Sequence, residues 1–121
     1  LWSVGRNGGN GNFQWNNAAD FGGTQMMTLD ASGNLGLGVT PSGWFASGVK
    51  ALQLGAGSLW SYSTTEIGLL QNAYYNSTGA YIYVANGYAS DYYQYQGSHV
   101  WRTAPSVIFT LAASINNSKS A

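Results

Sequence analysis

The 121-residue sequence contains no cysteine and one histidine, and both shortages restrict its chemistry. Small secreted domains often add disulfides to a marginal core, so this chain must find its stability elsewhere. His99 cannot form a metal site alone, because common sites use three or four protein ligands. Three copies of His99 around a trimer axis are an alternative, but a strand histidine is more often simply packed or solvated. We therefore expect no metal and no organic cofactor.

Charged residues are also scarce, at 7% of the chain against about 25% in ordinary globular proteins, and the formal net charge is zero. A nucleic-acid partner requires a basic stripe that displaces counterions, and the sequence has none. The same shortage disfavours an anionic membrane surface. No apolar run approaches the roughly 20 residues that a membrane-spanning helix needs. We expect neither a nucleic-acid partner nor membrane insertion.

The few charges leave sheet edges unprotected. Proteins usually blunt exposed edge strands with Lys, Pro or inward-facing charges, and this chain has two Lys and two Pro. A monomeric sheet of this composition should associate with itself unless other copies of the chain already cover its edges. The composition therefore favours an obligate homo-oligomer. Because the sequence begins with Leu1, we also expect a fragment or a processed product.

What is abundant points to an all-β fold. Aromatic residues make up 15% of the chain and glycine occurs 17 times, whereas strong helix formers are rare. Alternating patterns predict strands over 12–16, 26–31, 35–38, 50–54, 58–64, 66–75, 80–85, 90–96 and 98–103. Predicted turns lie at 32–34, 76–79 and 86–87. The closely spaced runs after residue 57 are typical of a small β-sandwich or meander.

Residues 27–38 read as strand, tight turn, strand. Asp30, Gly33 and Asn34 are the expected structural turn residues, with a positive φ at Gly33. After the turn, leucines alternate with glycines, which lets another backbone approach closely. A degraded copy follows at 109–116, with five identities to residues 27–34. This copy suggests a repeated unit along an extended molecule, although strand-turn-strand sequences also converge by chance.

Residues 27–41 resemble a segment common in bacteriophage tail fibre and tailspike proteins, often written there Asp-Ala-Ser-Gly-Asn-Leu-Gly-Ile-Gly-Thr-Thr followed by Pro. The stretch from Tyr95 to Pro105 resembles the linker between such units, and the rest matches in texture. In that family the segment usually lies in the distal fibre, often before a chaperone domain that trimerises the fibre and then cuts itself off. The resemblance implies a homotrimeric, fibre-like β structure in the virion tail fibre, outside the host cell.

The chain divides into three expected parts. Residues 1–55 form a Gly- and Asn-rich fibre-like unit, residues 56–105 form a Tyr-rich β unit, and residues 106–121 begin a second repeat or a tail.

No motif predicts catalysis. The Gly-x-Ser-x-Gly nucleophile motif is absent. Glycoside hydrolysis needs two carboxylates about 5–10 Å apart. The four acidic residues, Asp20, Asp30, Glu66 and Asp91, are scattered along the sequence. We name no catalytic residue and expect no enzyme, while a depolymerase with a site between subunits stays an alternative because such tailspikes exist among the relatives.

Eight tyrosines crowd into residues 74–95, and they have two interpretations. Tyrosine rings stack on sugars and their hydroxyls form hydrogen bonds, so they suit a binding surface. Cross-strand tyrosine pairs also stabilise sheets and fill subunit contacts, and this interpretation is slightly favoured. The candidate ligand-binding residues are Tyr81, Tyr83, Tyr88, Tyr92, Tyr93, Tyr95 and Trp101.

The sequence therefore predicts a structural segment of a trimeric phage tail fibre that contributes to attachment to a cell-surface glycan or protein receptor. The alternatives are a glycan-binding tip module, a polysaccharide depolymerase and a cellular surface adhesin of similar composition.

Overall fold

The computed structural model describes residues 1–107, and the part of the expected second repeat from residue 108 onward lies outside them. The described chain is all-β, as the composition predicts, with one short 3-10 turn. Its elements are β1 (Ser3–Arg6), β2 (Phe13–Asn16), η1 (Ala19–Phe21), β3 (Gln25–Leu29), β4 (Leu35–Leu37), β5 (Val49–Leu54), β6 (Gly57–Tyr62), β7 (Glu66–Gln71), β8 (Ala73–Tyr75), β9 (Tyr81–Tyr83), β10 (Gly87–Tyr95) and β11 (Ser98–Val107).

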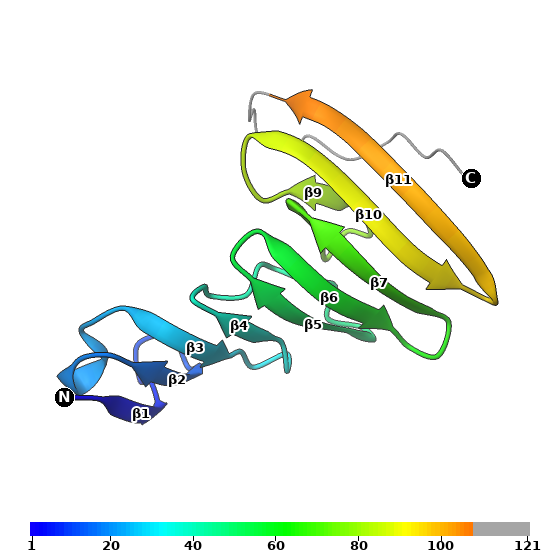
Figure 1. Ribbon diagram of the computed structural model, residues 1–121. Coiled ribbons are helices and arrows are strands. Elements are labelled where there is room, and N and C mark those ends of the chain that lie inside the picture. The colour runs from blue at the N-terminus through cyan, green and yellow to red at the C-terminus, as the bar shows by residue number, and fades with distance from the viewer. Residues whose placement is uncertain (108–121) are drawn as a thin grey trace.

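Nine strands form one elongated, twisted sheet in the order β1-β2-β3-β4-β5-β6-β7-β10-β11 (Figure 1). Neighbouring strands are antiparallel except β4 and β5, which are parallel. A parallel pair needs a crossover, and residues 38–48 provide it over one face of the sheet. The expected boundary at 55–56 lies in the turn between β5 and β6, which pair along their whole length.

The prediction of a single strand over residues 66–75 is wrong. Asn72 interrupts it with a φ of +58°, and the chain leaves the main sheet there. The Asn72 side chain accepts a hydrogen bond from Ala85 N and donates to the carbonyls of Ala85 and Tyr88. These bonds fix both ends of the excursion, so β8 and β9 form a separate hairpin over the same face as the crossover.

The hydrophobic core lies between this hairpin, the crossover and the sheet. Trp60 is its largest fully buried side chain and makes an edge-on contact with Tyr81. Trp44 in the crossover is bridged to Asn76 near the hairpin. The other buried apolar residues are Val49, Ala51, Leu70, Ala73, Tyr83, Ala89 and Ala104.

The covered face of the N-terminal half is polar. Gln14, Asn16 and Thr28 are fully buried there. The Asn16 amide donates to Gly23 O and accepts from the backbone N–H groups of Ala18 and Gly23, so a surface loop closes over this face. Buried polar groups need such partners, and for Asn16 the covering loop supplies them.

The turn between β3 and β4 is held by Asp30. Its carboxylate accepts hydrogen bonds from the backbone N–H of Asn34 at 2.8 Å and from the Asn34 side-chain amide at 3.0 Å. Gly33 between them has a φ of +83°. Of the alternating glycines, Gly36 makes the expected close backbone approach, and it does so within the chain itself, because a Cβ there would lie 2.1 Å from Val39 O. A Cβ on Gly38 would meet no atom within 4 Å.

No helix within residues 1–107 is long and apolar enough to cross a membrane.

Candidate functional site

Two features stand out on opposite faces of the sheet, and the first is a small pocket lined by tyrosines. It lies where the β8–β9 hairpin approaches strands β6, β7, β10 and β11, with a volume of about 190 Å³. Four phenol rings and two opposite charges converge on it. The lining residues are Tyr62, Glu66, Tyr75, Tyr81, Tyr93 and Arg102.

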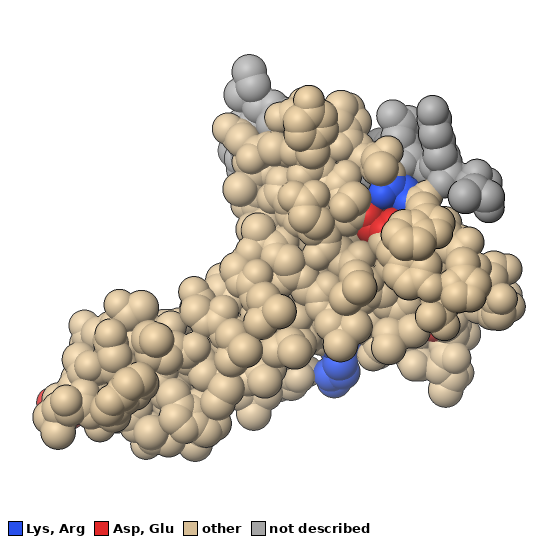
Figure 2. Space-filling model, in the orientation of Figure 1, with Lys and Arg blue, Asp and Glu red and all other residues tan. Residues whose placement is uncertain are grey.

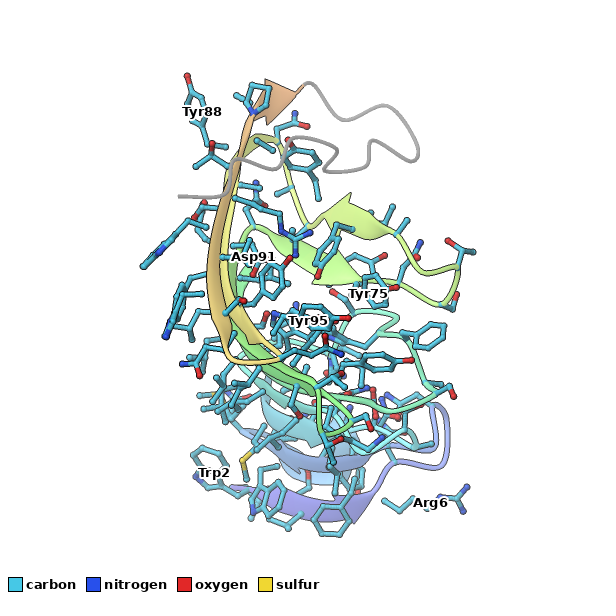
Figure 3. All side chains as sticks on the ribbon, turned by 90° about the vertical axis from the view of Figure 1, so that its right-hand side faces the viewer. Trp2, Arg6, Tyr75, Tyr88, Asp91 and Tyr95 are labelled. Carbon is cyan, nitrogen blue, oxygen red and sulfur yellow. The ribbon has the colours of Figure 1, made fainter. Side chains whose placement is uncertain are left out.

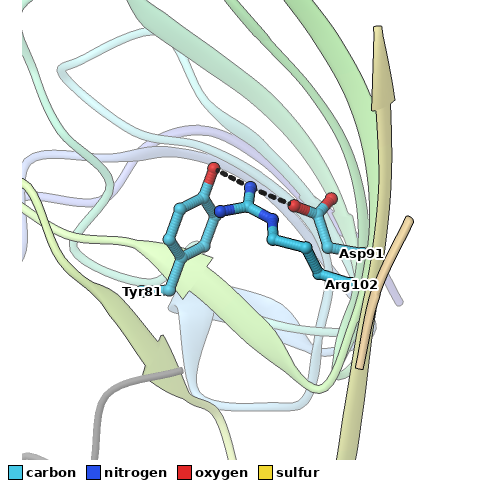
Figure 4. Close-up of polar contacts among 3 residues, drawn as sticks. All are labelled: Tyr81, Asp91 and Arg102. Carbon is cyan, nitrogen blue, oxygen red and sulfur yellow. Dashed lines mark hydrogen bonds and ion pairs between the residues drawn. The ribbon is translucent and has the colours of Figure 1, made fainter. Parts of the chain in front are cut away.

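An ion pair forms one wall of this tyrosine pocket. Asp91 and Arg102 face each other in the register of β10 and β11. The guanidinium donates to the Asp91 carboxylate at 2.5 Å and to the Tyr81 hydroxyl at 2.8 Å (Figure 4). Its carbon lies 4.3 Å from the ring centres of both Tyr81 and Tyr93. Arg102 is therefore held between two rings, and its orientation is fixed before any ligand arrives.

Burial controls the protonation of these groups. It raises the pKa of Asp91 to about 6, although Arg102 opposes the shift, and a weaker effect of Glu66 adds to it. Burial also raises the pKa values of Glu66 and Tyr81, again against the effect of Arg102. Burial lowers the pKa of Arg102, but Tyr81 and Asp91 outweigh it and the net shift is upward. The surroundings of Glu66 and Asp91 disfavour the charged form of each carboxylate, so both groups bind a proton more readily than they would in water.

Two polar atoms of the ion pair have no hydrogen-bond partner within residues 1–107. Asp91 is 3% exposed, yet one of its carboxylate oxygens has no hydrogen-bond partner among the described residues. The Nε atom of Arg102 likewise lacks one. Buried polar atoms usually have partners, so these two atoms are exceptions, as are Gln14 Nε2, Ser58 Oγ and Trp60 Nε1 elsewhere in the described chain.

A second polar cleft of about 420 Å³ adjoins the tyrosine pocket. It lies at the tips of the β6–β7 and β10–β11 hairpins and shares Glu66 with the pocket. The remaining lining consists mainly of hydroxyl and amide side chains: Ser61, Ser63, Thr64, Thr65, Ile67, Gln94, Gln96 and Gly97.

The second feature is an apolar row on the opposite face of the sheet. The strand register places eight large apolar residues side by side, one on each of the eight neighbouring sheet strands from β2 to β11. This apolar row consists of Phe13, Leu29, Leu35, Leu52, Leu59, Leu69, Tyr92 and Trp101. At the usual strand spacing of about 4.8 Å, its seven intervals span about 34 Å.

The apolar row is exposed while its polar neighbour is buried. Five members, from Phe13 at 39% to Leu69 and Trp101 at 56%, are exposed. The neighbouring line, one residue away on each strand, lies on the covered face and includes the buried Gln14, Gln53 and Leu70. In the usual antiparallel sheet the uncovered face is polar, whereas here the uncovered face carries the apolar row and the covered face carries both this line and the hydrophobic core.

Aromatic stacking ends the row at the β11 edge. Tyr92 lies 4.2 Å from Trp101 between ring centres and stacks on His99 at 5.8 Å. The Tyr92 hydroxyl also contacts His99 Nδ1 at 2.5 Å. A shallow groove of about 300 Å³ lies beside this aromatic group, lined in part by Leu69.

The structure separates the candidate ligand-binding residues into distinct places. Tyr81 and Tyr93 line the pocket, whereas Tyr83 is buried and donates its hydroxyl to Pro105 O. Tyr95 lies on the pocket side of β10 and Tyr88, at 71% exposure, projects from the opposite side (Figure 3). The other two candidates, Tyr92 and Trp101, belong to the apolar row.

Sequence reasoning missed four of the pocket residues: Tyr62, Glu66, Tyr75 and Arg102. One signal was present. Arg102 and Asp91 are isolated charges in a nearly uncharged, strand-rich segment, where alternation predicts burial of every second residue. A buried strand arginine needs a carboxylate partner, and Asp91 was one of few available.

Of the four acidic residues, Glu66 and Asp91 lie near the same arginine, while Asp30 serves the β3–β4 turn. Within residues 1–107, no three His, Cys, Asp or Glu side chains gather in a way that could hold a metal ion. Figure 2 shows one face of the molecule, on which the few charged side chains are scattered and form no patch.

Comparisons with protein-family models, curated proteins and solved structures give no match for this chain.

Proposed function

We propose that the chain is a structural segment of a homotrimeric fibre of the phage tail fibre type, in which the apolar row forms the contact between copies. The observation that carries this proposal is the apolar row itself, which lies exposed opposite a buried polar line. Monomeric soluble proteins rarely expose large contiguous apolar patches, and larger ones mark interaction surfaces.

A second copy of the chain is the occupant that fits best. The row crosses the strands over almost the whole twisted sheet, so the surface that covers it should be equally long and apolar and should follow the same twist. Identical rows placed around a common axis provide that surface. The fibre axis would then run along the row, with strands stacked across it.

Covering the apolar row would favour association. Burying a large apolar side chain completely is worth roughly 1.5–3 kcal/mol. The five exposed members, at 39–56% exposure, would each contribute on the order of 1 kcal/mol per chain. The neutral, charge-poor surface adds little repulsion between copies.

The stoichiometry of three and the phage setting rest on the resemblance of residues 27–41 to tail fibre proteins. A cellular adhesin built as a similar oligomer would use the same apolar row, so the row supports a β fibre more broadly than it supports a phage origin.

Two lysine variants of equal exposure test the proposal. Leu59 in the apolar row and Met26 in β3, outside the row, are each 43% exposed. We expect Leu59→Lys to dissociate the assembly in native mass spectrometry, because three lysines would meet at the axis, while Met26→Lys remains assembled. An assembly that survives Leu59→Lys would show that the row is not the contact.

A further inference from the structure

We propose that the tyrosine pocket binds one neutral sugar unit, the end residue of a longer glycan. The pocket lies on the face opposite the apolar row, so association through that row leaves it open. The inference therefore stands independently of the assembly, and under the proposed function it supplies the contact with a host surface.

The size of the pocket selects a small ligand. A volume of about 190 Å³ corresponds to roughly six water molecules, since each occupies about 30 Å³ in the liquid. Pockets for drug-sized molecules begin at about 300 Å³. A single six-membered sugar ring suits this space, whereas a disaccharide would have to extend beyond it.

The charges of the pocket select a neutral ligand. Glu66 and Arg102 are the charged lining residues, so a charged ligand of either sign would meet a like charge in the pocket. Arg102 is in addition already paired with Asp91, so an anionic ligand would have to compete with a buried carboxylate. A cationic ligand would lie beside the Arg102 guanidinium.

The remaining chemistry suits a polyol with an apolar face. Tyr62, Tyr75, Tyr81 and Tyr93 bring phenol hydroxyls, which both donate and accept hydrogen bonds, as sugar hydroxyls do. Arg102 occupies ring faces of Tyr81 and Tyr93, and Tyr75 packs against Tyr81 with ring centres 5.0 Å apart. Tyr62 is therefore the main ring for contact with the C–H face of a sugar, and Tyr75 contributes chiefly its hydroxyl.

The walls are held in place before a ligand binds. Phe45 packs edge-on against both Tyr62 and Tyr75, with ring centres 6.1 and 5.7 Å away. Tyr81 is fixed by its hydrogen bond from Arg102. Preformed walls reduce the entropy that binding costs, which matters for a ligand this small.

The adjoining polar cleft gives the glycan a path. Glu66 lines both spaces, so a chain whose last sugar occupies the pocket would pass Glu66 and reach Ser63, Thr64 and Thr65 in the β6–β7 turn. The strand residues of the cleft, Ser61, Ile67 and Gln94, lie on the face of the apolar row and stay outside this path. We therefore expect oligosaccharides to bind more tightly than their terminal monosaccharide.

The test uses the full chain and saturation-transfer NMR. The neutral probes are glucose, galactose, mannose and N-acetylglucosamine, and the charged probes are N-acetylneuraminic acid and choline. We expect signal from at least one neutral sugar and none from the charged probes. Signal from charged probes alone, or from no probe, would overturn the proposal.

Three conservative variants locate the site. Tyr75→Phe and Glu66→Gln keep the shape of the pocket and remove one hydroxyl or one charge. Each should raise the Kd of the bound sugar by about fivefold or more, the effect of losing one hydrogen bond. Tyr88→Phe, on the opposite face, should leave the Kd unchanged. Unchanged binding in both pocket variants, with melting temperatures equal to wild type, would place the sugar elsewhere.

Discussion

The buried carboxylate of Asp91 should make the protein less stable as the pH rises from 4 to 7. Its pKa is raised from 3.8 to about 6 by burial. The folded state therefore binds this proton more tightly than the unfolded state. The stabilisation is fully present below the unfolded pKa and is lost as the pH rises through about 6.

The magnitude follows from the shift. A difference of about 2.2 pH units between 3.8 and 6 corresponds to about 3 kcal/mol, at 1.36 kcal/mol per unit. We treat this as an upper value, because rearrangement around the ion pair would reduce it. Even half of it is a large part of the 5–15 kcal/mol that stabilises an ordinary domain.

Urea unfolding at pH 4, 5, 6 and 7, at one fixed protein concentration, measures the effect. Asp91→Asn removes the titrating group, so its unfolding free energy should change much less over this range. Glu66→Gln is the comparison variant. Because the pKa of Glu66 is also raised, this variant shows how much of the wild-type pH slope comes from Glu66 rather than from Asp91. Equal pH slopes in wild type and Asp91→Asn would refute the reasoning.

Two glycine substitutions test the backbone. Gly33→Val should lower the unfolding free energy by roughly 1–2 kcal/mol per chain, because the φ of Gly33 is +83°. Gly8→Val is the control, since a side chain there enters open space, and it should leave the unfolding free energy unchanged. Equal melting temperatures for the two variants would contradict this reasoning. Gly36→Ala should cost about 1–3 kcal/mol, because its Cβ would strike Val39 O and the crossover must move. Gly43→Ala meets no atom and is its control in the same thermal assay.

Local patterns were sufficient to predict most strands. Alternation and turn residues located the strand pairs around Gly33 and Gly79, both of which have positive φ. The turn expected at 86–87 joins β9 to β10, which lie in different sheets and do not pair. The break at Asn72 escaped prediction because nothing local marks it. Its left-handed conformation is held by hydrogen bonds to Ala85 and Tyr88, which only the folded chain brings near.

The two sites needed the strand order as well. Shortage of charge predicts self-association without saying through which surface. The apolar row depends on the parallel pairing of β4 and β5, which places Leu35 beside Leu52 although the crossover separates them in the sequence. The pocket depends on the hairpin folding back, which brings Tyr75 and Tyr81 to Glu66 and Arg102. Neither long-range arrangement follows from periodicity.

Sedimentation equilibrium of the wild-type chain at micromolar concentrations tests the central claim most directly. The apolar row and the fibre resemblance predict a single species of three times the chain mass, with a β-type circular dichroism spectrum. A monomer with that same spectrum would show that the exposed row needs no second copy, and would contradict the account.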